Sequence, residues 1–305
     1  MKLYYNNINI KTYLVRRLRK FKLFNYIFPL GTGGSPEYSF SVWIRHLNKL
    51  YSDGNGKIPE TIAELGPGST LGVGLAALLS GSSCYFALDV QNYINRDKLI
   101  KDFDEMVNIF KERRKINGNF PSHILTDNIL EKSLNETRIK TIRDEIILHG
   151  ENSKYIKYYA PWTDDKLIIY SSIDFILSQC VLEHVDQLEG CYTAMSKWLK
   201  PGGYSSHLVD FQCHEFTRHW NGHWAFTETE WDKVRGTNDW AINREPANNH
   251  NEYALKSGFE IIEFNRRKPI SKGISRNKLS KQFVNISDED LETSFIDILL
   301  RKKEN

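Results

Sequence analysis

The stretch Glu64-Leu65-Gly66-Pro67-Gly68-Ser69 decides the fold of this chain. It follows a short apolar run over 61–65 and precedes a longer apolar run over 69–79. This pattern predicts a strand, a tight glycine turn and a helix. Glycines at such a turn let the backbone approach a ligand closely, and the start of the helix offers free N–H groups. The turn therefore predicts a nucleotide-like or nucleoside-like ligand.

The residues around the turn narrow the class of ligand. A dinucleotide fingerprint needs a glycine three positions after Gly68, where this chain has Leu71, and the Gly-Lys-Ser/Thr of a phosphate-binding loop is missing. Glu64 favours a cationic or amine-bearing ligand, because its charge repels a phosphate. Asp89 ends the next predicted strand, where an acid typically binds ribose hydroxyls.

Short apolar runs alternate with helical patterns along most of the chain, which is typical of an α/β fold. We predict further strands over 84–90, 155–159, 173–178, 203–210, 259–265 and 294–300, and helices over 39–51 and 188–199. Two insertions, near 93–154 and 211–254, interrupt the alternation, and long connections of this kind tend to be functional lids. The first insertion carries predicted helices near 96–115 and 134–148. We expect one domain over 56–305, preceded by a basic helical segment over 1–55.

Four separated stretches resemble the successive motifs of class I S-adenosylmethionine-dependent methyltransferases. They are the glycine turn, Ala87-Leu88-Asp89, the run from Asp174 to Val185, and Leu199-Lys200-Pro201-Gly202-Gly203. Their order and spacing match over about 62–210, although the insertion after Asp89 departs from the compact core of the family. The resemblance implies a Rossmann-like fold with a seven-stranded sheet, and S-adenosyl-L-methionine as the cofactor.

The resemblance also implies which residues hold the cofactor. Glu64, Gly66, Pro67 and Gly68 would flank its methionine part, and Asp89 would bind both ribose hydroxyls.

Two further segments complete the implied cofactor site. The loop after the third strand would cover the adenine, with Ala160, Pro161 and Trp162 as the candidates. Ser178 and Gln179 follow the fourth strand and would face the sulfonium end of the cofactor.

Three residues are candidates for the chemistry of methyl transfer. The leaving group of a sulfonium is already good, so alignment of the reacting atoms supplies much of the rate. A hydroxyl acceptor also profits from a base, and histidine is the usual choice near neutral pH. Asp210 and His214 follow the fifth predicted strand and His184 the fourth, which predicts all three at the carboxyl edge of the sheet. We expect Asp210 and His214 to supply the base, with His184 as the alternative.

The histidines do not form a recognised metal motif. His214 and His219 are one residue too far apart for H-E-x-x-H, and positions five apart do not share a helix face. We therefore expect no metal site. A divalent ion held by carboxylates and histidine is the alternative that the sequence leaves open.

The second insertion is rich in tryptophan, histidine and asparagine, and it predicts the acceptor. Trp220 and Trp224 offer flat aromatic faces and Asn243 a fixed donor, which suit a sugar or another polyol, while Arg244 suits a phosphate or carboxylate. The segment also resembles methyltransferases found with bacterial surface-polysaccharide pathways. We expect O-methylation of a sugar, a nucleotide-sugar or a glycan end. The alternatives are another small molecule with a lipid-like or phosphate oxygen, or a cofactor-binding subunit without activity.

Composition indicates the setting in which the protein works. Its 305 residues are 40% hydrophobic and 26% charged, as in ordinary globular proteins, and a net charge of +3 does not predict a nucleic-acid partner. No apolar stretch approaches the length of a membrane-spanning helix. The four cysteines form no C-x-x-C pair, so we expect them reduced, in the cytoplasm.

The front of the chain is basic. No acid precedes Glu37, and apolar residues recur at helical spacing with cations between them. This predicts a helix that packs on the domain. The alternative is a helix over 10–24 that contacts an anionic membrane surface or a partner protein. The sequence does not indicate an oligomeric state.

Overall fold

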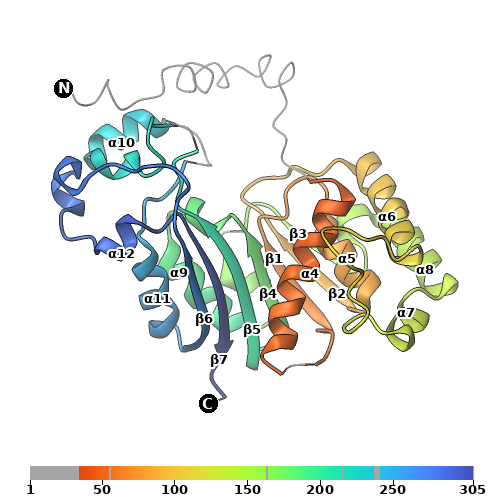
Figure 1. The fold of residues 1–305 in the computed structure, drawn as a ribbon. Coiled ribbons are helices and arrows are strands. Elements are labelled where there is room, and N and C mark those ends of the chain that lie inside the picture. Colours follow the sequence, from red (N-terminus) through yellow and green to blue (C-terminus); the bar gives the residue numbers. More distant parts are fainter. Residues whose placement is uncertain (1–33, 55, 163, 215, 237–240, 305) are drawn as a thin grey trace.

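A seven-stranded sheet forms the centre of the molecule (Figure 1). The structure is a computed structural model that describes residues 34–54, 56–162, 164–214, 216–236 and 241–304, so the predicted contact segment over 10–24 lies outside the described residues. The strands are β1 (Thr61–Leu65), β2 (Cys84–Leu88), β3 (Ile156–Tyr159), β4 (Ile173–Gln179), β5 (Leu199–Asp210), β6 (Phe259–Arg267) and β7 (Phe295–Lys302). All seven predicted strands are present, and the predicted Rossmann-like α/β class is confirmed.

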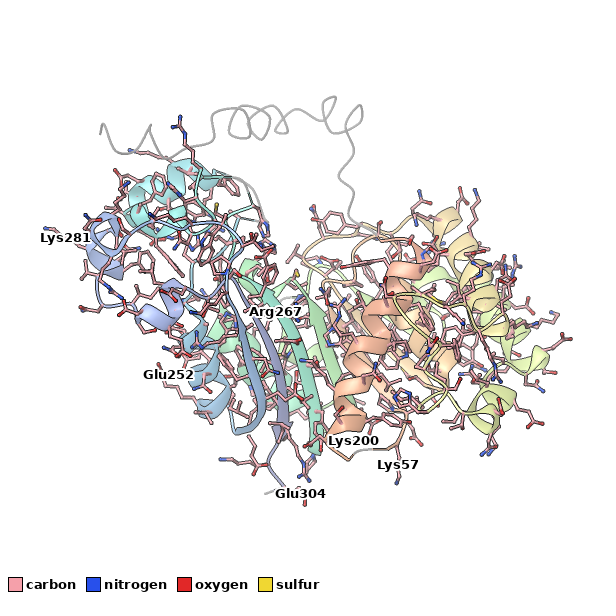
Figure 2. All side chains as sticks on the ribbon, in the orientation of Figure 1. Lys57, Lys200, Glu252, Arg267, Lys281 and Glu304 are labelled. Atoms are coloured by element: carbon pink, nitrogen blue, oxygen red, sulfur yellow. The ribbon has the colours of Figure 1, made fainter. Side chains whose placement is uncertain are left out.

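The order of the strands creates a binding position at one edge of the sheet. The order is β3-β2-β1-β4-β5-β7-β6, with β7 antiparallel to both of its neighbours. Because β1 pairs with β2 on one side and β4 on the other, the direction of winding reverses at β1. Open α/β sheets bind ligands outside the carboxyl ends of the strands at such a reversal. Lys57 and Lys200 mark the opposite, amino edge in Figure 2.

Helices cover both faces of the sheet. The first layer contains α4 (Pro36–Ser52), α5 (Gly72–Ser80), α6 (Arg96–Lys111), α7 (Asp127–Ser133) and α8 (Glu136–His149). The opposite face carries α9 (Leu188–Trp198) and α11 (Ala247–Lys256). Side chains of neighbouring strand residues enter different cores, as Ile62 and Ala63 of β1 do, which is the alternation expected of a strand.

Helix α4 belongs to the domain core rather than to a separate front segment. Ser35 caps its first turn by accepting a hydrogen bond from the Tyr38 N–H. Trp43 and Leu47 are fully buried, and the Trp43 ring packs edge-on against Phe175 of β4 at 6.3 Å. The domain therefore begins before residue 56, which was the boundary expected from the sequence.

The two insertions have different roles in the fold. The helices α6, α7 and α8 of the first insertion bury apolar side chains in the same core as α4 and α5, so they widen the first helical layer. The second insertion contains α10 (Glu228–Arg235) and has a small core of its own. The connection between β6 and β7, which contains α12 (Asp288–Leu291), packs against it through Asn221, whose side chain bonds to Ile274 and Leu291.

The cysteines and the lengths of the helices can be compared with what the sequence predicted. The cysteines are free thiols, as expected. Within the described part of the chain, no helix combines the length and the apolar character needed to cross a membrane.

Candidate functional site

A cavity of about 1500 Å³ opens at the carboxyl edge of β1, β2 and β4. Gly66 and Gly68 line it from the turn after β1, Asp89 from the end of β2, and His184 from the segment after β4. The cavity thus lies at the reversal of the sheet and brings together four residues that the sequence had singled out.

Some of the cavity wall was not predicted. Val90, Gln91 and Tyr93 line the cavity directly after Asp89. The Tyr158 hydroxyl donates a hydrogen bond to the Gln91 carbonyl at 3.1 Å and so fixes this loop on β3. Adjacency to Asp89 was a signal that could have identified these residues.

The turn after β1 requires glycine for conformational and steric reasons. Gly66 and Gly68 have φ values of +66° and +68°, in the left-handed region that favours glycine. A Cβ atom on Gly66 would stand 2.5 Å from the Cγ2 atom of Val181, which also lines the cavity. The backbone therefore reaches the cavity wall without a side chain in between.

The Asp89 carboxylate connects the glycine turn to the end of β2. One oxygen accepts a hydrogen bond from the Gly68 N–H at 3.2 Å, and the other accepts one from the Val90 N–H at 2.7 Å. Asp89 is 5% exposed, and this burial raises the pKa of its carboxyl, against the lowering effect of the backbone donors. An acid is thus held at the cavity wall, beside the turn.

Glu64 lies behind the turn and does not line the cavity. Its carboxylate is buried and accepts a hydrogen bond from the Tyr85 hydroxyl at 2.5 Å. Burial raises the pKa of Glu64 to about 8, although the bond from Tyr85 works in the opposite direction. The adjacent Pro67 is half-buried and is also not among the residues that line the cavity.

Of the three candidates for covering the adenine, Trp162 lines the cavity. Its backbone N–H donates to the Asp89 carbonyl at 3.0 Å, and its ring packs edge-on against Trp198 at 5.7 Å. Ala160 instead packs against the first core. A flat aromatic surface therefore stands on the same side of the cavity as Asp89.

The two residues expected at the sulfonium end do not line the cavity. Ser178 is fully buried, and its hydroxyl hydrogen-bonds to His207 of the neighbouring strand at 2.7 Å. The amide oxygen of Gln179 accepts a hydrogen bond from Arg45 of α4 at 3.0 Å. The prediction for Ser178 does not fit its position, because its side chain points into the sheet's core.

The predicted catalytic residues lie together at the ends of β4 and β5. The rings of His184 and His214 stack with their centroids 5.1 Å apart. An Asp210 oxygen lies 4.0 Å from Nδ1 of His214, and a Glu183 oxygen lies 3.9 Å from Nε2 of His184. The structure therefore adds Glu183 to the three residues named from the sequence.

Glu183 is in an unusual environment for an acid. It is 1% exposed, and its two carboxylate oxygens accept no hydrogen bond of ordinary geometry from the described residues, although the backbone N–H groups of Glu183 and Asp210 lie close enough to favour the charged form. Burial raises the pKa of its carboxyl well above the ordinary value. Buried carboxylates are normally paired or hydrogen-bonded, so this group calls for an explanation.

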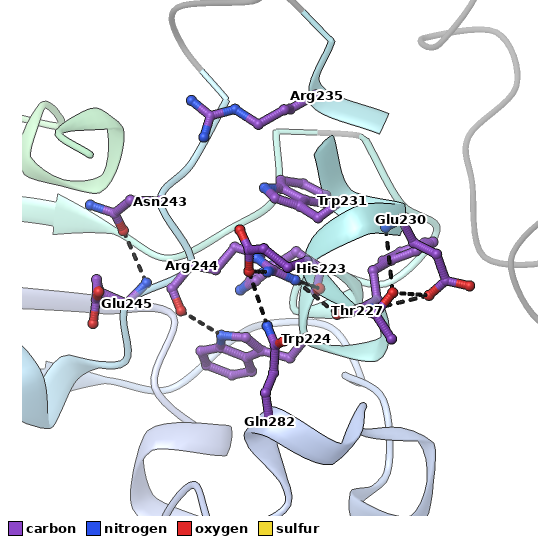
Figure 3. Close-up of polar contacts among 12 residues, drawn as sticks. His223, Trp224, Thr227, Glu230, Trp231, Arg235, Asn243, Arg244, Glu245 and Gln282 are labelled. Carbon is purple, nitrogen blue, oxygen red and sulfur yellow. Dashed lines mark hydrogen bonds and ion pairs between the residues drawn. The ribbon is translucent and has the colours of Figure 1, made fainter. Parts of the chain in front are cut away.

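The tryptophans expected to contact the acceptor are part of the core. Trp220 and Trp224 are buried, and neither lines the cavity beside the glycine turn. Figure 3 shows the Trp224 indole directed at Arg244, whose carbonyl accepts its N–H at 3.0 Å. These rings support the second insertion instead of offering a free face to a sugar.

Arg244 and Asn243 also have structural partners. The Arg244 guanidinium is buried over the rings of Trp231 and Phe283, donates to the Phe226 carbonyl at 2.8 Å and pairs with Glu228.

Asn243 joins the second insertion to the segment that carries His184. Its amide donates to the carbonyls of Leu182 and Val185 at 2.8 and 2.9 Å, and its backbone N–H donates to the Glu183 carbonyl at 2.6 Å. Asn243 therefore sets the position of His184.

A second, smaller pocket of about 690 Å³ adjoins the cavity. The two share Asp186 and Arg235, whose side chains form a two-point ion pair with N–O distances of 3.1 and 3.0 Å. Amides and acids form much of its wall; they include Asn243, Asn248, Asn249, Gln282, Asn285, Glu228 and Glu245. In Figure 3, Arg235 lies at the top of the view, away from the contacts of Arg244. The pocket suits a ligand with many hydroxyl groups.

Comparison with known proteins agrees with this geometry. Residues 164–206 match the family model described as a methyltransferase domain, a segment that contains β4, α9 and the beginning of β5. No curated protein matches the sequence.

Solved structures of similar fold come from several organisms. A putative sarcosine dimethylglycine methyltransferase from Galdieria sulphuraria is 11% identical, with 87% of this chain and 86% of that chain covered and a TM-score of 0.46. An S-adenosylmethionine-dependent methyltransferase from Mesorhizobium loti is 14% identical, with 79% and 90% covered and a TM-score of 0.39. A complex of the Haloferax volcanii Trm112 methyltransferase activator with a putative methyltransferase gives 12% identity, 80% and 83% coverage and a TM-score of 0.41.

The strand order and the family match together indicate a methyltransferase that uses S-adenosylmethionine. The enzyme class and the cofactor predicted from the sequence are thereby confirmed.

Proposed function

We propose that this protein transfers the methyl group of S-adenosyl-L-methionine to a hydroxyl of a sugar, a nucleotide-sugar or a glycan end. One observation carries the proposal: a single cavity is lined by the glycine turn, by Asp89 and by His184. A donor bound along the turn would have its reactive end beside the histidines. The proposal includes the cytoplasmic setting expected from the sequence.

The residues of the cavity wall suggest how the cofactor lies. Asp89 would accept hydrogen bonds from the ribose hydroxyls, and the Trp162 ring would contact the adenine. The methionine part would pass Gly66 and Gly68, where the absence of side chains allows close approach. Glu64 would then act from behind the turn as an acid that favours the ammonium group.

The reaction requires an acceptor oxygen in line with the methyl carbon and the sulfur. The oxygen forms a bond to the methyl carbon while the carbon–sulfur bond breaks and leaves its electron pair on sulfur. The hydroxyl proton is released, and S-adenosylhomocysteine remains. We place the acceptor oxygen beside His184, which lines the cavity, and His214, which stacks on it. The sequence-based assignment of Asp210 and His214 as base machinery stays a prediction.

The adjoining pocket supports a polyhydroxylated acceptor. Its wall contains amides and acids, a combination of hydrogen-bond donors and acceptors to which sugar hydroxyls can bind, and it shares Asp186 and Arg235 with the cavity. The sequence predicted that Trp220 and Trp224 contact the sugar. They do not contribute to this pocket, because they are buried. The sugar class of the acceptor is therefore supported by the polar wall of this pocket instead of by aromatic stacking.

A transfer assay with methyl-labelled cofactor tests the proposal. The purified full chain is incubated with nucleotide-sugars, oligosaccharides, lipid acceptors and phosphate compounds. We expect label in a sugar-containing acceptor, with S-adenosylhomocysteine formed in equal amount and strongly reduced labelling by Asp89→Ala. Label in a lipid or phosphate oxygen alone would refute the acceptor class. Tight cofactor binding with no transfer to any acceptor would favour a binding subunit.

A further inference from the structure

The buried cluster at the ends of β4 and β5 has the composition of a metal site. Glu183, His184 and His214 each offer one ligand atom, and these atoms lie within 4.8 Å of one another. Two imidazoles and one carboxylate form a ligand set that leaves coordination positions open on a transition metal. The three residues come from two separate segments of the chain, so the fold, and not sequence proximity alone, brings them together.

The environment of Glu183 gives an independent reason to expect a cation. Its carboxylate is 1% exposed, and its oxygens accept no hydrogen bond of ordinary geometry from a side chain or backbone group among the described residues. It points toward the imidazoles, with Oε1 at 3.9 Å from Nε2 of His184. A bound cation would stabilise the ionised form of this buried acid, which burial otherwise disfavours.

The geometry needs only a small adjustment to bind an ion. Zinc lies about 2.0–2.2 Å from nitrogen and oxygen ligands, which places tetrahedral ligands about 3.4 Å apart. The present separations of up to 4.8 Å exceed this by on the order of 1 Å. Side-chain rotation can supply such a change.

We infer that Glu183, His184 and His214 bind a divalent transition-metal ion at the acceptor side of the cavity. Imidazole nitrogens suit zinc, cobalt and iron, whereas magnesium prefers oxygen ligands and retains its waters. The ion is therefore of the zinc type and not of the magnesium type.

Neighbouring residues have the arrangement that supports metal ligands. Histidine ligands usually direct their second ring nitrogen at a carboxylate or carbonyl, which fixes the ring. Asp210 lies 4.0 Å from Nδ1 of His214 and takes this place. Asn243 holds the backbone on either side of the Glu183–His184 pair through the carbonyls of Leu182 and Val185. Both are positioning residues and not ligands.

The ion gives the acceptor side of the site a chemical role. It would face the cavity beside His184, and an oxygen close to it loses its proton more easily. The imidazoles then serve as ligands, and the ion supplies the activation that the sequence assigned to an imidazole base. This role in methyl transfer rests on the proposed function, but ion binding itself does not.

Cobalt titration of the metal-free full chain tests the inference without any turnover. We expect one Co²⁺ per chain, with visible absorption bands of a nitrogen- and oxygen-ligated ion, displacement by Zn²⁺ and none by equimolar Mg²⁺. His184→Ala and His214→Ala should abolish the bands. Asp210→Asn should weaken binding about 10–100-fold, as expected of a residue that orients a ligand. His219→Ala, which changes a histidine of the same loop outside the cluster, is the control and should bind like the wild type.

The outcomes separate this inference from the proposed function. Absent Co²⁺ bands, or bands that persist in both His184→Ala and Glu183→Gln, would overturn the metal site, even if methyl transfer to a sugar occurs. Bands that depend on these residues establish the site even if no acceptor is methylated. Glu183→Gln preserves the size of the side chain, and circular dichroism of each metal-free variant identifies any that fails to fold.

Discussion

Replacing Asp89 is the sharpest perturbation of the cofactor site. Its carboxylate lines the cavity and is the group that we assign to the ribose hydroxyls. Asp89→Ala removes both oxygens, whereas Asp89→Asn keeps one oxygen and replaces the other by a donor. The two variants therefore remove two acceptor oxygens and one acceptor oxygen, respectively, at the same position.

The structure allows the size of the effect to be estimated. A hydrogen bond to a charged group contributes about 1.5–3 kcal/mol, which corresponds to roughly 10- to 150-fold in affinity. Asp89→Asn should lie near the lower end of this range, because its remaining oxygen still serves one acceptor role. Asp89→Ala should reach the upper end, because it also removes the acceptor of the Gly68 N–H, at 3.2 Å, and of the Val90 N–H, at 2.7 Å.

Isothermal titration calorimetry with S-adenosylhomocysteine measures the effect. Glu189→Ala is the matched control. Glu189 is an acid that lines the same cavity from α9, and we assign it no contact with the cofactor. Its affinity should equal that of the wild type. Thermal unfolding of each variant shows whether the turn still folds.

Equal affinities for the wild type and a folded Asp89→Ala variant would refute the reasoning. So would a Glu189→Ala variant that loses as much affinity as Asp89→Ala.

Three further predictions concern the surroundings of Asp89. Gly66→Ala places a methyl group 2.5 Å from Val181 at a residue whose φ is +66°. We therefore expect a lower unfolding temperature and loss of cofactor binding. A variant with wild-type stability and wild-type cofactor affinity would contradict the turn geometry. Trp162→Ala should weaken cofactor binding by about 1 kcal/mol, which is roughly fivefold in affinity by calorimetry. The affinity for free ribose, which has no adenine, should not change. An unchanged cofactor affinity would exclude Trp162 from the adenine site. Burial holds the pKa of Glu64 at about 8, so a cofactor ammonium that favours the charged carboxylate should release a proton on binding. The affinity of the wild type should therefore rise toward pH 8 more steeply than that of Glu64→Gln, and parallel pH profiles would exclude this coupling.

Sequence patterns predicted the strands well because each has a clear local cause. The bounds of β1 were predicted to the residue, since an apolar run ends at a glycine turn. Helix α5 begins at Gly72, later than predicted, because Leu71 has a φ of +51° and the Gly72 N–H bonds to the Thr70 hydroxyl. Such turn geometry depends on contacts that a run of apolar letters does not record.

The candidate site was predictable near the carboxyl ends of the strands. Asp89 directly follows β2 and His184 lies five residues after the end of β4, and both line the cavity. Ser178 lies near the end of β4 itself, but its hydroxyl hydrogen-bonds to His207 on the next strand, a pairing that only the register reveals. Tryptophans are equally ambiguous: Trp224 has the composition of a sugar-binding residue and the burial of a core residue.

Two features depended on distant parts of the chain and had no local signal. Asp186 and Arg235 meet between the cavity and the adjoining pocket, although they belong to different segments. The sequence showed Glu183 only as a neighbour of His184, and its burial beside His214 emerges from the packing of β4 against β5.

The most direct test of the account is a crystal structure of the full chain with S-adenosylhomocysteine. We predict that the ribose hydroxyls lie within hydrogen-bond distance of the Asp89 carboxylate, that the methionine part passes Gly66 and that the sulfur faces His184. A nucleoside bound elsewhere, or with its ribose turned away from Asp89, would contradict the account.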